Sequence, residues 1–306
     1  MKMSSFLFRY LNNSNILFFL AFVLGLIFGD YASSLKGYIL PALVLIMSLS
    51  TTKITLSELT HVKKYFQDIL IVFLINYLFL SGLILLANHL FIRDHDLYVG
   101  FVVMAAIPSA VAVLPFTYLL KGDMMVSLIG SASLYLLALV MAPTLSFQLL
   151  DFGRIEPLKL LSTLIQLILI PFLVSRLLMR WKAFHQVKEN TNVLVNLAFF
   201  LIIYVVIGMN RSTFLGHFDI LILVSSIAFL RTFVSGHLVD LFSRLAGIDR
   251  ERRMSYVLFG SFKNLGLAAA ITIVLFNERA AIPAAVAIPF EILFFIWFNY
   301  FQKRWG

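Results

Sequence analysis

The chain has no cysteine and few charged residues. Asp, Glu, Lys and Arg make up 13% of its 306 residues, whereas soluble domains carry about 25%. The lack of cysteine excludes disulfides, thiolate metal sites and cysteine nucleophiles. The sequence also lacks His-Glu-x-x-His, Gly-x-Ser-x-Gly and P-loop motifs. We therefore expect no enzyme and no bound cofactor.

Hydrophobic residues dominate what is present. They form 61% of the chain, and the mean hydropathy is +0.97. This composition is typical of an all-α polytopic membrane protein whose main partner is the lipid bilayer. The net charge of +9 does not indicate nucleic-acid binding, because the basic residues are spread over short loops, as the membrane interface favours.

Apolar stretches separated by short charged segments predict about ten spans in a single transmembrane domain, residues 1–306. We place the spans near 15–33, 36–52, 68–91, 97–120, 124–149, 157–178, 191–209, 218–243, 254–277 and 281–301.

The basic residues predict the orientation of these spans. Of the 24 Lys and Arg residues, sixteen fall in segments that would be cytoplasmic if the N-terminus is, and six fall in the opposite segments. The positive-inside rule then places both termini in the cytoplasm and the protein in the cell membrane. Ten spans divide into two inverted repeats of five, residues 15–156 and 157–306, an architecture common in secondary transporters.

Lys263 is the most unusual residue within a predicted span. It lies in Gly260-Ser-Phe-Lys-Asn-Leu-Gly266, between two apolar runs. A lysine at this depth costs about 2.5–3.5 kcal/mol on insertion scales, and the flanking glycines allow the helix to break. The matching span of the first half contains Ile107-Pro-Ser-Ala-Val-Ala-Val-Leu-Pro115, where proline also interrupts the helix. Irregular spans in matching positions indicate a midplane ligand or ion site.

Two stretches resemble the bile acid:sodium symporter family. The first is the Pro108–Pro143 segment, with Thr117-Tyr-Leu-Leu-Lys-Gly-Asp123 as its most specific part. The second is Asn264-Leu-Gly-Leu-Ala-Ala-Ala270, similar to the family's crossover in the ninth span. The resemblance can be followed from about residue 15 to residue 300.

This resemblance implies a fold and a function. Spans three to five and eight to ten would form a core, and spans one, two, six and seven a panel. Discontinuous helices four and nine would cross, and a small organic anion would bind beside the crossing. Alternating access would then make the protein a secondary active transporter, a symporter of the anion.

The family's sodium ligands are largely replaced here. Four of the positions that carry them now hold an apolar or a cationic side chain, while two hydroxyls and two amides remain. By the resemblance, the replaced positions are Val113, Leu114, Phe259 and Lys263, and the polar ones are Asn76, Ser127, Ser131 and Asn264.

We expect the Lys263 ammonium to replace the bound cations, which argues against sodium as the coupling ion. Other roles for these residues remain open from the sequence. Lys263 could hold the anion as a point charge, release a proton during the cycle, or form an ion pair with Glu291. Glu291 could itself carry a proton or pair with Arg231, which could also contact substrate. The protein could therefore be a proton-coupled or uniport carrier, or a receptor-like paralogue that transports nothing. The sequence names neither the substrate nor the oligomeric state.

Overall fold

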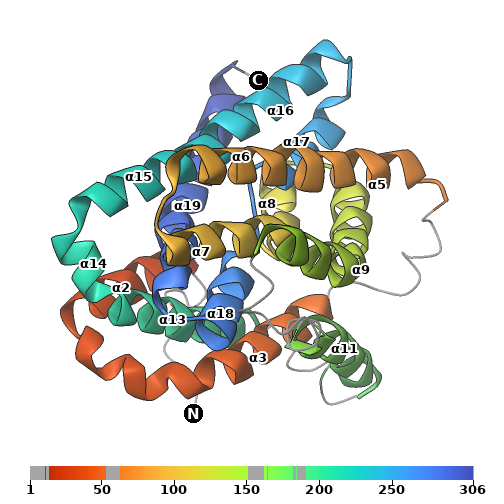
Figure 1. The fold of residues 1–306 in the computed structure, drawn as a ribbon. Coiled ribbons are helices and arrows are strands. Elements are labelled where there is room, and N and C mark those ends of the chain that lie inside the picture. Colours follow the sequence, from red (N-terminus) through yellow and green to blue (C-terminus); the bar gives the residue numbers. More distant parts are fainter. Residues whose placement is uncertain are drawn as a thin grey trace.

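The computed structural model describes residue 11 and residues 14–52, 63–150, 162–163, 165–181, 184 and 191–305. Every regular element in this part of the chain is helical (Figure 1). The predicted boundary between the two repeats, at residues 156 and 157, lies outside the described residues, as does the start of the sixth predicted span.

In the first half, the helices follow the predicted spans closely. They are α2 (Ser14–Ile27), η1 (Gly29–Tyr31), η2 (Ser33–Tyr38), α3 (Ile39–Thr51), α5 (Phe66–Phe73), η3 (Leu74–Leu80), α6 (Ser81–Phe91), α7 (His95–Ala106), α8 (Val113–Leu119) and α9 (Met124–Leu149).

The second half has a similar series. It comprises η4 (Ile165–Leu169), α11 (Ile170–Arg180), α13 (Thr191–Met209), α14 (Arg211–Gly216), α15 (Phe218–Phe229), η6 (Leu230–Val234), α16 (Ser235–Leu245), α17 (Arg250–Phe259), α18 (Leu265–Leu275), η7 (Arg279–Ala281) and α19 (Ile282–Trp305).

Six of these helical stretches are long and apolar enough to cross a membrane, so the chain is a multi-pass membrane protein. Three further apolar helices are shorter, among them His95–Ala106 and Leu265–Leu275, each of which ends or begins at a helix break. The long stretches are Ser33–Thr51, Phe66–Phe91, Met124–Leu149, Thr191–Met209, Phe218–Leu245 and Arg279–Arg304.

The helices fall into two groups. α13 packs against α2 and α3, and α3 packs against α11; these four helices lie together in the lower part of Figure 1. α5, α9, α16 and α17 lie in the upper part, where α9 packs on α5 and α16 on α17. α18 contacts the first group through α3 and α13, and on its other side it contacts α7 and α19.

Aspartates begin several helices because their carboxylates accept hydrogen bonds from the first free backbone N–H groups. Asp94 caps α7 through the Leu97 N–H, and Asp249 caps α17 through the Arg252 N–H. Asp123 caps α9 through two N–H groups.

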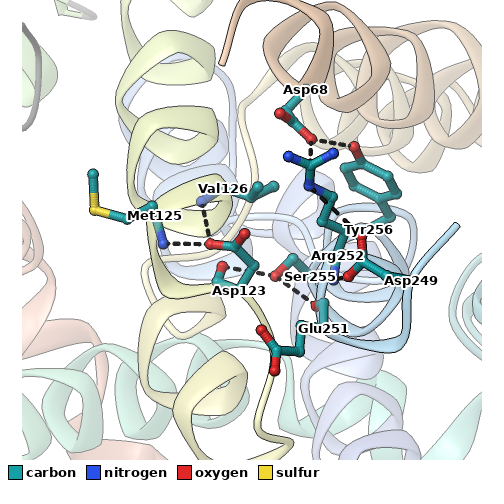
Figure 2. A network of polar contacts seen from close by, with 9 residues as sticks. All are labelled: Asp68, Asp123, Met125, Val126, Asp249, Glu251, Arg252, Ser255 and Tyr256. Atoms are coloured by element: carbon teal, nitrogen blue, oxygen red, sulfur yellow. Dashed lines mark hydrogen bonds and ion pairs between the residues drawn. The ribbon is translucent and has the colours of Figure 1, made fainter. Parts of the chain in front are cut away.

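A network of polar contacts joins three helices at one end of the molecule (Figure 2). Asp68, at the start of α5, accepts a 2.5 Å hydrogen bond from the Tyr256 hydroxyl of α17 and lies 3.6 Å from Arg252 Nε. Ser255 donates to the Asp123 carbonyl beside α9. On the other side of α17, Arg253 Nε lies 3.1 Å from the Asp240 carboxylate of α16. These contacts fix the first half of α17 between its neighbours.

Different loops meet at the opposite end. Arg279 Nη2 lies 2.7 Å from the Asp94 carboxylate, and Arg211 Nη1 lies 3.2 Å from the Asp30 carboxylate. The sequence assigns the loops that carry these pairs to the same side of the membrane.

Candidate functional site

Two interrupted helices meet at the centre of the described structure. α7 ends at Ala106 and its span resumes with α8 at Val113. Pro108 disfavours helical backbone at Ile107, which is extended. The other interruption separates α17 from α18. The Asn264 N–H donates a 3.0 Å hydrogen bond to the Pro108 carbonyl, so the two interruptions are in direct contact.

The Lys263 side chain enters the interrupted region and is fully buried. Its Nζ donates to four oxygens at 2.8–3.0 Å, and it lies 4.8 Å from the centre of the Tyr77 ring. The ring adds a cation–π contact. The four acceptors are Asn76 Oδ1, Ser81 Oγ and the carbonyls of Ala105 and Ile107.

The four acceptors favour the charged form of Lys263. Three of them, the Asn76 amide oxygen and the two carbonyls, have no hydrogen to donate. A neutral amine has two N–H groups for these oxygens, whereas an ammonium has three and can donate to all three of them. In this conformation the geometry of the site therefore suits a cation.

The two carbonyls that accept hydrogen bonds from Lys263 lie at the C-terminal end of α7. The last carbonyls of a helix lack partners within it and carry the negative end of its dipole. Ala105 and Ile107 provide two such oxygens. The Lys263 ammonium thus stabilises the end of an interrupted helix that water cannot reach.

Two of the four acceptors, Asn76 and Ser81, are held in place by hydrogen bonds of their own. Asn76 Oδ1 accepts from Lys263, while its Nδ2 donates to the Phe259 carbonyl at 2.9 Å. Ser81 Oγ lies 2.9 Å from the Asn76 carbonyl and 2.6 Å from the Ala105 carbonyl. The Ser81 hydroxyl can donate its hydrogen to either of these carbonyls. Its oxygen then still has a lone pair that accepts a hydrogen bond from Lys263.

Glu291 pairs with Arg231 rather than with the Lys263 ammonium. Its Oε1 lies 2.7 Å from Arg231 Nη2 and also accepts a 3.0 Å hydrogen bond from the Lys263 backbone N–H. The Arg231 side chain is fully buried, and that of Glu291 is 11% exposed. Of the two partners that the sequence leaves open for Glu291, the structure therefore favours Arg231.

Asn264 links the second interruption to both helix groups. Its Oδ1 accepts from the Leu267 N–H and so caps α18. Its Nδ2 lies 2.9 Å from the Tyr135 hydroxyl of α9 and 3.7 Å from Met47 Sδ of α3. The side chain therefore lies where α3 meets the interrupted helix.

Ser127 and Ser131 lie apart from this cluster. Ser127 Oγ is 2.7 Å from Thr117 Oγ1 on α8. Ser131 is buried, and its hydroxyl has no hydrogen-bond partner in the described part of the chain. The Phe259 ring packs against α9 at Gly130, the residue before Ser131: a Cβ added at Gly130 would lie 2.9 Å from its Cζ. Neither serine hydrogen-bonds Lys263 in the described residues.

The structure thus unites five of the seven site residues predicted from the sequence. It also adds Ser81 and Tyr135, which the sequence did not single out. Ser81 lies five residues after Asn76, and a regular α-helix would place the two on different faces. η3 is a π-helix, whose bonds join residues five apart. The contacting five are Lys263, Asn264, Asn76, Glu291 and Arg231.

The comparison with family models decides the class of protein. The model of the SBF-like CPA transporter family matches residues 15–296. The chain belongs to this family. The match covers both interrupted helices and every residue of the site, so the resemblance seen in the sequence is confirmed. A comparison with curated proteins found no match.

Proposed function

We propose that the protein is a secondary transporter of small organic anions, and that Lys263 serves as its permanent cation in place of sodium. The decisive observation is the buried ammonium with four oxygen ligands. Amide and carbonyl oxygens at a helix end are the ligands that an alkali cation would use. Here a covalently attached cation takes them, and no free cation is needed to fill the site.

The charges at the site favour an anionic substrate. With Lys263, Arg231 and Glu291 all ionised, the cluster carries a net charge of +1. An unbalanced charge away from water is costly, and a bound anion would reduce that cost. The N-terminus of α18 adds the positive end of a helix dipole beside Asn264. The substrate would lie there, between the interrupted helices and α3.

We further propose ten spans in two inverted repeats, with helices four and nine crossing. Support comes from matching irregularities in the two halves. The third predicted span contains the π-helix η3, and the eighth contains the π-helix η6. The fourth and ninth are each interrupted. Paired irregularities of this kind mark the site in inverted-repeat transporters.

The proposed orientation places both termini in the cytoplasm of a cell-membrane protein. The distribution of basic residues supports this side, and the contacts at the two ends support the pairing of loops on which it rests, because the described loops assigned to one side contact one another. Asp123 contacts Glu251 and Ser255 at the predicted cytoplasmic end. Arg279 pairs with Asp94 at the other end.

Transport into proteoliposomes tests the function and the role of Lys263. With labelled taurocholate as the probe, we expect the wild-type protein to show uptake that is unchanged when choline replaces sodium. In Lys263→Gln, which removes the permanent charge, we expect uptake to fall about tenfold or more, or to require sodium. A tenfold effect corresponds to about 1.4 kcal/mol.

The matched control is Lys303→Gln, which removes an exposed lysine near the end of α19. We expect it to transport like the wild type. Wild-type uptake that rises steeply with sodium would refute the permanent-cation role. So would a Lys263→Gln protein that folds and transports normally without sodium.

A further inference from the structure

We infer that Glu291 is the proton-binding group of the transport cycle, and that one proton moves with each monovalent anion. This inference rests on the proposed function and adds its coupling ion. It begins from the three ionisable side chains that meet at the interrupted helices, Lys263, Arg231 and Glu291.

In the proposed function, two of the three charges are constant. Lys263 keeps the ammonium form that its four acceptors favour. Arg231 is a guanidinium, which stays protonated in proteins. Of these three groups, Glu291 is the one whose charge can change during the cycle.

The geometry of Glu291 leaves one oxygen free to take a proton. Its Oε1 receives both hydrogen bonds, from Arg231 Nη2 and from the Lys263 N–H. Its Oε2 accepts no hydrogen bond from any described residue, and the side chain keeps 11% of its surface exposed. A proton on Oε2 would leave both bonds to Oε1 in place.

Most other charged groups near α19 lie at the ends of the spans. α19 packs against α7, α13, α15, α18, η6 and η7, and its side chains also contact α16. α13 and α18 contain no charged residue. In α7, α15, η6 and η7, the charged side chains apart from Arg231 are at the helix starts, namely His95 and Asp96 on α7, Asp219 on α15 and Arg279 on η7. On α16, His237 accepts a hydrogen bond from Trp297 and packs against Phe294. Within the spans, Glu291 is thus faced by Arg231 and Lys263, and His237 is a further titratable group against α19.

The charge balance shows what such a proton would do to the cycle. The empty site has a net charge of +1 when Glu291 is ionised. A bound monoanion alone would bring it to zero, so the complete cycle would move one negative charge across the membrane. With a proton on Glu291 as well, the loaded and the empty site carry the same net charge. The complete cycle then moves no net charge across the membrane.

The contacts of Glu291 give its protonation a way to influence the site. Glu291 on α19 holds Arg231 on η6 and the backbone of Lys263 in the interruption between α17 and α18. Neutralising the carboxylate weakens a charge-assisted bond to the guanidinium. The position of the interrupted helix therefore depends on whether Glu291 carries a proton.

Flux measurements in proteoliposomes test this inference with labelled taurocholate, whose sulfonate stays ionised across the pH range used. With the membrane voltage clamped at zero, we expect an inward proton gradient to drive at least tenfold accumulation by the wild type. Glu291→Gln mimics the protonated carboxyl. We expect it to retain exchange of labelled for unlabelled taurocholate but to lose accumulation.

Asp240→Asn is the matched control. Asp240 is also a buried carboxylate paired with arginine, but it lies at the end of the spans. We expect this variant to keep both exchange and proton-driven accumulation. Exchange by the wild type without any effect of the proton gradient would overturn the inference and leave the proposed function intact. Loss of exchange in folded Glu291→Gln would also overturn it, because the ion pair would then be structural.

Infrared difference spectroscopy of the purified protein gives a test that needs no substrate. As the pH is lowered, we expect the carbonyl band of a protonated buried carboxyl to appear in the wild type and in Asp240→Asn, but not in Glu291→Gln. Other buried carboxyls, such as Asp68 and Asp240, can add bands of their own, so the decisive quantity is the difference between variants. If the wild type and Glu291→Gln give the same bands, the inference is wrong. If the band behaves as expected but the wild type shows no taurocholate exchange, the inference stands and the proposed function fails for this anion.

Discussion

At the scale of single residues, the stability of the site depends on how completely its polar atoms are paired. Asn76 makes two of these contacts. Its amide oxygen accepts a hydrogen bond from Lys263, and its amide nitrogen donates one to the Phe259 carbonyl. Removing it would leave a buried ammonium with one ligand fewer and a carbonyl with none. Breaking a buried charged interaction in this way costs more than losing a neutral hydrogen bond.

We therefore predict that Asn76→Leu destabilises the protein by about 3 kcal/mol or more. Asn88→Leu is the control, since Asn88 is equally buried on α6 but bonds only the Tyr98 carbonyl. It should cost about 1 kcal/mol. Thermal unfolding in one detergent measures both variants. Equal losses would show that the charge of Lys263 does not depend on Asn76.

At the scale of the elements, the α8–α9 turn contains a local strain. Lys121 has a φ of 55°, the left-handed region that favours glycine. The following residue, Gly122, lies against α17: a Cβ there would be 3.1 Å from the Met254 Cβ. The turn is tight because α9 begins directly after it, at the Asp123 cap.

We predict that Lys121→Gly stabilises the protein by about 1 kcal/mol, because glycine adopts this φ without the steric cost. Lys121→Ala removes the same charge but keeps a Cβ, so its stability should stay near that of the wild type. The midpoint of chemical unfolding compares them. A gain of the same size in both variants would assign the effect to charge instead.

The elements also show how far the sequence could predict this structure. Hydropathy indicated the helices. The glycines and Pro108 indicated both interruptions, because these residues change the conformation of the backbone beside them. The position of Ser81 beside Asn76 could not be predicted, since it depends on a π-helix that no local signal announces. The choice of Arg231 as the partner of Glu291 depends on how α19 packs against η6.

At the scale of the whole molecule, an ion pair holds the end opposite the network of Figure 2. Asp94 at the start of α7 binds Arg279, which precedes α19. Burial opposes ionisation of Asp94. The hydrogen bonds from Arg279 and the Leu97 N–H, with the charge of Arg279, outweigh it and lower the pKa of Asp94.

The sign of this shift gives a pH prediction. A carboxyl whose pKa is lowered by folding stabilises the folded state above its unfolded pKa, which is about 3.9. That contribution is lost as the pH falls through the folded pKa. We therefore expect Asp94→Asn to lower the melting temperature at pH 7 and to have a smaller effect at pH 3. An equal effect at both pH values would contradict the assignment.

A tethered ammonium has one more consequence for the molecule. A dissolved ion occupies its site only to the extent that its concentration allows, whereas Lys263 occupies its site at all times. A carrier that needs a bound ion cannot complete its transport cycle until that ion binds. This protein would not depend on sodium on either face of the membrane. Its direction would then follow the supply of its cargo and of protons, and it could work in surroundings that contain no sodium.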